Sequence, residues 1–385
     1  MKNTICSAPW QATYYKESMG KYKMCCSFKK WTKAESPEDY YNSPVVESVR
    51  EKMLNGEWHE GCTLCHKLEN AGLESDRETF NKHLEVDKLD TSKFELKWLD
   101  YRPGNLCNLK CRMCHSSNSS LIDKETKKHP ELKKFMETIP DYESELLPSI
   151  CNDETFRDLE VLKILGGEPT IDPQVQKLLD WTISNGYAKN INLRYTTNAT
   201  NINENWIKAV KQFKTTKIQL SLDGTGKTYD YIRTGANWHK IKENIMLMPK
   251  KINNIRNIGS NIVFSVYDCF TIDQWYPELL EIKETMQREY GIDINFNIID
   301  CTWPTYQMVS NLPEEYKQIV VDKIDSMPID KVLKAVRHHT TKKAKGIPEK
   351  EVAMFFEHND MLDRIRKTNI NDISEHYETL RQNTL

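Results

Sequence analysis

The sequence lacks a net charge of either sign, a long hydrophobic run and a recognisable leader. Its 54 lysines and arginines nearly balance 56 aspartates and glutamates, which leaves a formal charge of -2 over 385 residues. No global field therefore draws the chain to nucleic acid or to an anionic membrane, and we expect neither as a partner. No run approaches the ~18 apolar residues of a membrane span. The opening MKNTICSAPW has neither the apolar core nor the cleavage site of a secretory signal. We therefore expect a cytoplasmic protein.

Cysteine, by contrast, is plentiful, with eleven residues. In a reducing compartment, cysteines serve as metal ligands, catalytic thiols or buried apolar residues rather than as disulfides. Seven of them fall into two groups that resemble ligand sets. The first group comprises Cys6, Cys25 or Cys26, Cys62 and Cys65, and the second comprises Cys107, Cys111 and Cys114.

The segment CNLKCRMCH, residues 107–115, allows several interpretations. From Cys111 it spells C-x-x-C-H, the pattern that attaches a c-type haem and that recurs at 62–66. From Cys107 it spells C-x-x-x-C-x-x-C, with three thiolates close enough to hold one iron-sulfur cluster. A zinc site of these cysteines with His115 is a third possibility. Three cysteines leave one iron of a four-iron cluster without a protein ligand, and a catalytic cluster needs that open position to bind a small chelating molecule.

From about residue 94 onwards, apolar β-branched runs alternate with helical patterns, which is typical of βα units in a parallel sheet. The runs predict six strands, at 94–101, 159–165, 191–197, 217–222, 261–267 and 292–299. Six units are too few to close an eight-stranded barrel. The predicted fold class is therefore α/β, a partial (β/α)6 TIM-type barrel with a small N-terminal iron-sulfur domain and a C-terminal helical extension.

We predict three regions: an N-terminal cluster domain at 1–90, the partial barrel at 91–305 and a helical region at 306–385. The segment 172–187 predicts a helix that buries Val175, Leu178, Leu179 and Ile183. Residues 121–154 form a polar, helical insertion after the first strand. The pattern does not indicate what this insertion does.

Polar and glycine residues follow several predicted strands, where parallel βα folds bind their ligands. The Gly-Gly turn lets the backbone approach a ligand closely, the glutamate suits an amine, and the arginine suits a carboxylate. These residues are Gly166, Gly167, Glu168 and Pro169 after the second strand, Asn198 after the third, and Ser221, Asp223 and Arg233 after the fourth. Together they fit a ligand that combines an amino acid with a nucleoside.

With these motifs in this order, residues 94–310 resemble a radical S-adenosylmethionine (radical SAM) enzyme. The resemblance implies that Cys107, Cys111 and Cys114 hold a catalytic 4Fe-4S cluster whose open iron chelates S-adenosylmethionine. It also implies that residues 166–169 contact the methionine amine, Ser221 and Arg233 its carboxylate, and Asn198 the ribose region. Met113 stands where the family often has an aromatic residue, and we expect it to pack near the adenine. The haem interpretation leaves Cys107 and these strand-end residues unexplained and requires export.

The N-terminal cysteines resemble the auxiliary-cluster module called a twitch or SPASM domain, although in well-known members that module follows the barrel. By resemblance, Cys6, Cys25, Cys62 and Cys65 hold a second 4Fe-4S cluster. Cys26 could replace Cys25, and a structural zinc ion is the alternative occupant.

Two further cysteines follow the last two predicted strands, each directly after an aspartate. Asp268, Cys269, Asp300 and Cys301 are therefore candidates for hydrogen or proton transfer, although both cysteines could simply be packing residues. The resemblance implies hydrogen abstraction from a peptide, a protein side chain or a small metabolite, with an electron donor such as flavodoxin or ferredoxin. Epimerisation, cross-linking and dehydrogenation remain open outcomes. The competing hypothesis is a metal- or cluster-bearing binding module that makes no radical.

Overall fold

The computed structural model describes residues 4–72, 74–140 and 147–384. The chain folds into two compact units. Unit 1 comprises residues 1–104, 141–196 and 204–216, and unit 2 comprises residues 105–140, 197–203 and 217–385. Two of the boundaries between the units fall within strands, at 196/197 and 216/217. The predicted division into an N-terminal cluster domain, a barrel and a helical region, with boundaries near residues 90 and 305, concerns function and stays a prediction.

The strands of unit 1 lie in the order β7-β6-β4-β1-β2-β3. Their bounds are β1 (Ala12–Lys16), β2 (Lys21–Lys23), β3 (Thr32–Lys33), β4 (Trp98–Arg102), β6 (Val161–Ile164) and β7 (Asn192–Thr197). Strands β7, β6, β4 and β1 run parallel, and β2 and β3 add an antiparallel edge. The N-terminal residues thus extend the same sheet, with Tyr15 of β1 beside Tyr101 of β4.

The helices of unit 1 are α1 (Ala8–Gln11), α2 (Pro37–Tyr41), α3 (Pro44–Asn55), α4 (Thr63–Asn70), α5 (Asp76–His83), α7 (Asp153–Phe156), α8 (Pro173–Ser184) and α9 (Glu204–Val210). Helix α8 is the helix predicted at 172–187. Asp172 caps its start by accepting a hydrogen bond from the backbone of Gln174, and Val175, Leu178 and Leu179 are buried. Ile183 is only partly buried.

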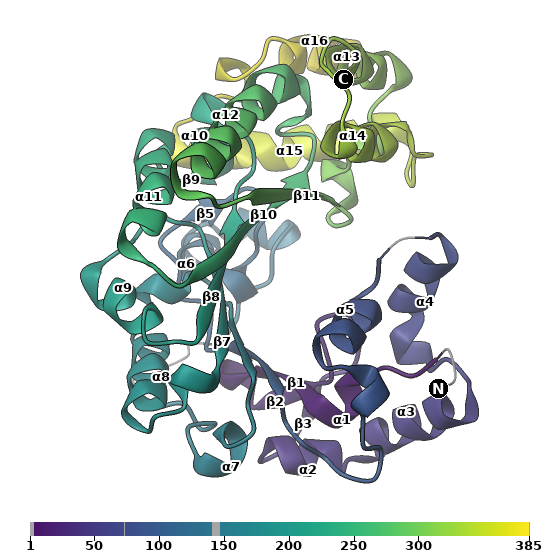
Figure 1. Ribbon diagram of the computed structural model, residues 1–385. Coiled ribbons are helices and arrows are strands. Elements are labelled where there is room, and N and C mark those ends of the chain that lie inside the picture. Colours follow the sequence, from purple (N-terminus) through teal and green to yellow (C-terminus); the bar gives the residue numbers. More distant parts are fainter. Residues whose placement is uncertain (1–3, 73, 141–146, 385) are drawn as a thin grey trace. The chain divides into compact units, whose positions relative to one another are not determined.

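In unit 2, β8 (Thr215–Ser221), β10 (Ile255–Phe264) and β11 (Ile294–Asp300) are neighbours in that order, and β10 and β11 are parallel. A separate short pair joins β5 (Lys110–Cys111) to β9 (Arg233–Thr234). The helices are α6 (Ser120–Lys128), α10 (Gly226–Ile232), α11 (Trp238–Lys251), α12 (Ile272–Tyr290), α13 (Glu314–Asp325), α14 (Lys331–Thr341), α15 (Pro348–Arg366) and α16 (His376–Thr384). Figure 1 shows α12, α13, α15 and α16 as coiled ribbons of this unit.

The predicted fold class is confirmed: the chain has a mostly parallel sheet in a partial TIM-type barrel, followed by a helical C-terminal region. Each of the six predicted strands has a counterpart, namely β4, β6, β7, β8, β10 and β11. Strand β10 begins at Ile255, six residues before the predicted start. The insertion at 121–154 contains the helical segments of 120–128, 130–134 and 153–156. Its residues 141–146 lie outside the described residues.

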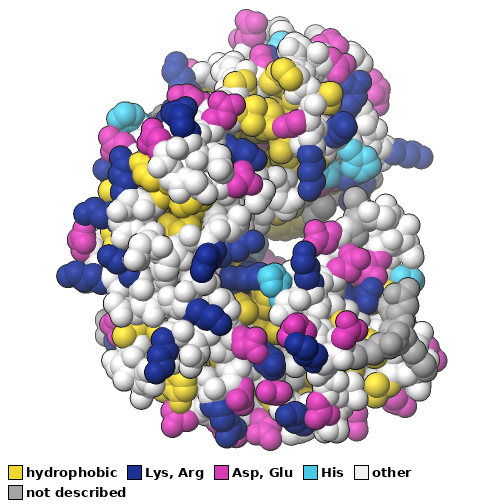
Figure 2. Space-filling model, viewed as in Figure 1, with side chains coloured by type: hydrophobic (Ala, Val, Ile, Leu, Met, Phe, Trp, Pro, Cys, Tyr) yellow, Lys and Arg dark blue, Asp and Glu magenta, His cyan; other side chains and the backbone are white. Residues whose placement is uncertain are grey.

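Charged side chains of both signs are interspersed over the face drawn in Figure 2, in keeping with the near-zero formal charge. Among the helices of the described residues, none combines the length and the apolar character needed to cross a membrane.

Candidate active site and cysteine clusters

Cys107, Cys111 and Cys114 occupy one loop of unit 2 that begins after β4. The Cys114 backbone N–H donates to the Cys111 carbonyl over 3.1 Å, which folds the end of the loop into a tight turn. Burial, together with the neighbouring Cys111 and Cys107 thiols, raises the pKa of the Cys114 thiol to about 12. The three thiols are therefore close enough to feel one another's charge. Met113, partly exposed, lies within the turn.

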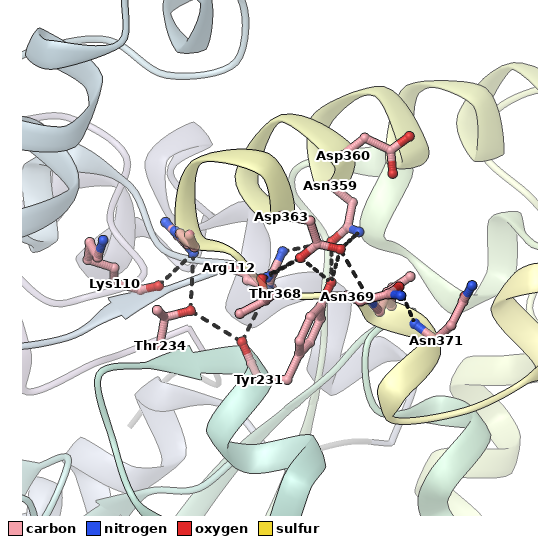
Figure 3. Close-up of polar contacts among 12 residues, drawn as sticks. Lys110, Arg112, Tyr231, Thr234, Asn359, Asp360, Asp363, Thr368, Asn369 and Asn371 are labelled. Carbon is pink, nitrogen blue, oxygen red and sulfur yellow. Dashed lines mark hydrogen bonds and ion pairs between the residues drawn. The ribbon is translucent and has the colours of Figure 1, made fainter.

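Arg112, between two of these cysteines, anchors the loop to the C-terminal helix α15 (Figure 3). Its side chain is fully buried. The guanidinium donates to the Tyr231 carbonyl at 3.1 Å, to Asn359 Oδ1 at 2.8 Å, to Asp363 Oδ1 at 2.6 Å and to Thr368 Oγ1 at 2.7 Å. It also lies 3.7 Å from the centre of the Tyr231 ring. Four acceptors and one aromatic face thus fix the direction of this side chain.

Arg366, at the end of the same helix, makes a second connection, in which a side chain of α15 reaches to the loop. Its Nη1 donates to the Lys110 carbonyl over 2.9 Å, and its Nη2 pairs with Glu125 at 2.6 Å. Glu125 also accepts from Lys110 Nζ at 2.7 Å. The backbone on both sides of Cys111 is thereby held by residues of the C-terminal region.

Arg233 faces Cys111 across the β5–β9 pair. Its Nη2 donates to Asp223 Oδ2 at 2.5 Å, and its Nη1 lies 3.8 Å from the Cys111 sulfur. Burial disfavours the charged guanidinium, but Asp223 and Cys111 outweigh this effect, so the pKa of Arg233 is raised. Asp223 also accepts from the Val263 backbone at 2.9 Å. The structure thus brings together two of the predicted cofactor residues and one predicted cluster ligand.

Asn198 is joined to the same loop through Asn108, the residue after Cys107. Its Nδ2 donates to Asn108 Oδ1 at 3.1 Å, and its Oδ1 accepts from the Thr200 hydroxyl at 2.6 Å. Asn108 in turn donates to Thr200 at 2.8 Å. Ser221 is the last residue of β8, one residue before the predicted end of that strand.

The Gly166–Pro169 segment lies in unit 1, directly after β6. A Cβ at Gly166 would lie 3.3 Å from Pro103 Cδ and 3.4 Å from the Gly104 carbonyl oxygen, so the close backbone approach requires glycine. Glu168 is buried, and its Oε1 accepts from the Thr170 backbone at 3.1 Å and from the Thr170 hydroxyl at 2.6 Å. Gly167 is partly exposed, and Pro169 begins a short 3-10 turn.

The four candidates for hydrogen or proton transfer have different surroundings in unit 2. Asp268 is fully buried, and its Oδ1 accepts from the Ser265 backbone at 2.8 Å. Among the described residues, its Oδ2 has no hydrogen-bond partner. Burial raises the pKa of Asp268 well above its ordinary value. Cys301 is buried near Asp268, and Cys269 is enclosed in the core. The Asp300 carboxylate pairs with Lys342 at 3.1 Å.

The N-terminal cysteines share one small cavity in unit 1. Cys6, Cys25, Cys62 and Cys65 line a cavity of about 30 Å³, whose apolar walls include Phe28, Met53, Trp58 and Phe80. Burial raises the pKa of all four thiols, and that of Cys62 reaches about 12. Cys26 is exposed and donates to Asp76 over 3.1 Å. The structure therefore selects Cys25 rather than Cys26 as the fourth residue of the cavity.

Both cysteine sets offer the donor chemistry of an iron-sulfur cluster, because thiolates are its ligands. Within the described residues, no three histidine, cysteine, aspartate or glutamate side chains converge on the position of a single metal ion. A four-iron cluster spreads its thiolates over a larger volume than one ion does. His115 directs its Nδ1 to Ser117 at 2.7 Å and packs edge-on against Trp303, with 5.8 Å between the ring centres.

Residues 101–265, which include the three-cysteine loop, match the family model described as "Radical SAM superfamily". The chain carries a radical SAM domain. The match covers less than half of the chain, and a domain of this class implies S-adenosylmethionine and a 4Fe-4S cluster as cofactors. The matched residues contain most of the predicted cofactor set, from Cys107 through Gly166 to Arg233.

Several solved structures are similar to this chain over about half of their length. One is anSMEcpe with bound AdoMet and the Cp18Cys peptide, at 19% identity and a TM-score of 0.38, covering 58% of this chain and 57% of that one. Another is SuiB of Streptococcus suis bound to precursor peptide SuiA, at 18% identity and a TM-score of 0.35, covering 58% and 45%. No curated protein matches the chain. The radical SAM assignment rests on residues 101–265 rather than on these likenesses.

The sequence analysis missed the residues that position the cysteines. Arg112, Asn108 and Arg366 hold the three-cysteine loop, and Asp76 holds Cys26. A charged residue between two cysteines was the available signal for Arg112. Its side-chain acceptors lie about 250 positions away, with a separation of 251 residues for Asp363, and the Tyr231 carbonyl lies 119 positions away, so no local pattern connects them.

Proposed function

We propose that this enzyme cleaves S-adenosylmethionine reductively and abstracts hydrogen from a peptide, a protein side chain or a small metabolite. In this proposal, Cys107, Cys111 and Cys114 hold the catalytic cluster, and Cys6, Cys25, Cys62 and Cys65 hold an auxiliary one. The catalytic cluster would supply one electron, which breaks the bond between the sulfonium sulfur and C5' to give methionine and a 5'-deoxyadenosyl radical. The observation that carries the proposal is the family match over residues that contain all three cysteines of the loop.

The chain's own residues would orient the cofactor. Asn198 and Ser221 are proposed to face the nucleoside and the amino acid, and the backbone at Gly166 leaves room for close approach. Arg233 is proposed to act on the carboxylate. Because its Nη2 already pairs with Asp223 and its Nη1 lies near Cys111, a carboxylate would have to share this guanidinium with them.

An auxiliary cluster is supported by the cavity that the four N-terminal cysteines line. Its apolar walls would exclude water from the group it holds, which raises the strength of electrostatic interactions inside. Such a cluster would bind the substrate or accept an electron from a product radical. Asp268 is the best placed of the four candidates to donate or accept a proton, because one oxygen of this buried carboxyl has no partner among the described residues.

The proposal is tested by an assay for S-adenosylmethionine cleavage under anaerobic conditions. The chain is reconstituted with iron and sulfide, reduced with dithionite, given S-adenosylmethionine and assayed for 5'-deoxyadenosine by chromatography and mass spectrometry. We expect 5'-deoxyadenosine from the wild type, and none from a variant with Cys107, Cys111 and Cys114 all changed to alanine. That variant should retain about half the iron, on the auxiliary cluster. Full iron content in it would show that these cysteines do not hold a cluster.

A further inference from the structure

One face of the unit 1 sheet carries two rows of cationic side chains. The strand register places Lys23, Tyr14, Asp100, Lys163 and Arg194 side by side across β2, β1, β4, β6 and β7. A second row lies two residues further along these strands and contains Lys33, Lys21, Lys16 and Arg102. Because side chains alternate along a strand, residues two apart share a face. Within these two rows, seven cations accompany one carboxylate, Asp100.

The opposite face of the same strands is apolar and is covered by helices. Its row contains Tyr22, Tyr15, Tyr101, Ile164 and Tyr195, each 5% exposed or less. Tyr22 stacks on Tyr40 of α2 at 5.7 Å between ring centres, and Tyr195 meets Trp206 of α9 at 5.4 Å. The hydrophobic core therefore lies on that side. The cationic side chains lie on the other side, where Lys33 is exposed and the remaining cations are partly exposed. Helix α5 covers part of that side: its Phe80 and His83 pack on Trp98, and Arg194 lies 2.7 Å from His83 Nε2.

The cations of the first row are held in place rather than extended into solvent. Lys163 pairs with Asp100 at 3.1 Å, Arg194 lies 4.1 Å from the centre of the Trp98 ring, and Lys23 lies 4.8 Å from that of Tyr14. Burial lowers the pKa of Arg194 to about 10 and also lowers that of Lys23. These cations thus lose hydration on folding, and a bound anion would offset that loss.

The first row ends beside the proposed auxiliary site. Lys23 Nζ donates to the Cys26 carbonyl over 2.7 Å, and Cys25, the preceding residue, lines the four-cysteine cavity. A molecule bound to these cations would therefore lie near the auxiliary cluster that the proposed function places there.

We propose that this face binds an acidic peptide segment of the substrate, with Lys16, Lys21, Lys23, Arg102 and Arg194 receiving its carboxylates. This inference rests on the proposed function, because it names the substrate class of that enzyme. Side chains two apart on an extended peptide repeat at about 6.8 Å, which is also the separation of two residues along each strand. Carboxylates at alternate positions of the peptide therefore match the two rows.

A nucleic acid fits this face less well than a peptide. Single-stranded nucleic acids are bound by aromatic rings that stack on bases, together with cations that follow the backbone. Tyr14 and Trp98 are each only 3% exposed, and Lys23 and Arg194 lie over their rings. These rings therefore have no open face to offer a base.

The test uses the reconstituted full chain and a fluorescent peptide of alternating glutamate and alanine. Fluorescence anisotropy compares it with a peptide of alternating glutamine and alanine and with an oligothymidylate of equal charge. The test variant combines Lys16→Gln, Lys21→Gln and Arg194→Gln. The control variant combines Lys177→Gln and Lys208→Gln in helices with Lys211→Gln in the turn after α9, which remove the same charge at exposed positions. Circular dichroism confirms that both variants are folded.

We expect the glutamate peptide to bind at least tenfold more tightly than the glutamine peptide. The test variant should lose at least tenfold in affinity and the control variant less than twofold. Equal binding of the two peptides, equal loss in the two variants, or tighter binding of the oligothymidylate would each overturn the inference. If wild-type chain binds the peptide as expected but forms no 5'-deoxyadenosine, the proposed function fails instead. If it forms 5'-deoxyadenosine but does not bind the peptide, only this inference fails.

Discussion

At the scale of single residues, Arg112 connects the proposed catalytic loop to a distant part of the chain. A buried guanidinium is costly unless all its donors are used, and here Asn359, Asp363 and Thr368 of the C-terminal region accept from it together with the Tyr231 carbonyl. The C-terminal region of unit 2 therefore does more than cover the core, because it sets the position of the turn that contains Cys111 and Cys114.

Replacing Arg112 by methionine should destabilise the chain by about 3–5 kcal/mol, because the mostly buried Asp363 carboxylate loses its cationic partner. The measurement is equilibrium unfolding in urea under anaerobic conditions. Arg381→Met is the matched control. Arg381 pairs with Asp360, which lies on α15 like Asp363, but the Arg381 side chain is 36% exposed. That pair should contribute less than about 1 kcal/mol. Similar losses in both variants would contradict the anchoring role of Arg112.

His358 should make the chain less stable in mild acid. Burial, followed by Arg366 and Arg112, lowers its pKa from the ordinary 6.5 to about 3, and neither ring nitrogen has a hydrogen-bond partner among the described residues. Between these two values the unfolded state binds a proton that the folded state does not. Stability should therefore fall as pH decreases through this window, by at most about 1.4 kcal/mol per pH unit.

The His358→Phe variant should remove this part of the pH dependence. The ring packs against Phe135 and Tyr306, with 4.7 Å and 5.4 Å between ring centres, so phenylalanine suits the same surroundings. Urea unfolding at pH 7.5 and at pH 5 measures the difference, and the exposed His239→Gln is the control. An unchanged pH slope in His358→Phe would show that other groups cause it.

At the scale of elements, the loop that follows β2 places two adjacent cysteines in different surroundings. Cys25 lines the cavity with Cys6, Cys62 and Cys65, whereas Cys26 is directed to Asp76. Neighbouring residues of an extended or turning backbone point in different directions, so only one of the two can join the other three thiols.

Cys25→Ser should therefore lose the auxiliary cluster and about half of the iron, whereas Cys26→Ser should keep full iron content. Iron and acid-labile sulfide are measured after anaerobic reconstitution, and each variant serves as the control for the other. Loss of iron in Cys26→Ser with retention in Cys25→Ser would reverse the assignment.

At the scale of the whole molecule, cluster binding should contribute to folding. The seven cysteines proposed as cluster ligands are buried or partly buried in the described chain, and a metal site that forms only in the folded state adds its binding free energy to stability. The reconstituted chain should therefore melt at a higher temperature than the metal-free chain in anaerobic calorimetry. The variant with Cys107, Cys111 and Cys114 changed to alanine should show only part of this gain. Equal melting temperatures with and without iron would argue against clusters of structural importance.

The sequence by itself determined the main strands and indicated the chemistry that we propose for them. Alternation of apolar residues predicted six strands, and the spacing of three cysteines with the strand-end motifs indicated the radical SAM class, because both signals are local in the chain. Only the tertiary structure decided which residues meet. It paired β1 with β4, placed Cys25 rather than Cys26 in the four-cysteine cavity, joined Arg112 to α15 and aligned the cations of six strands on one face. These contacts join segments far apart in sequence, and they depend on strand register and helix packing, which no local pattern specifies.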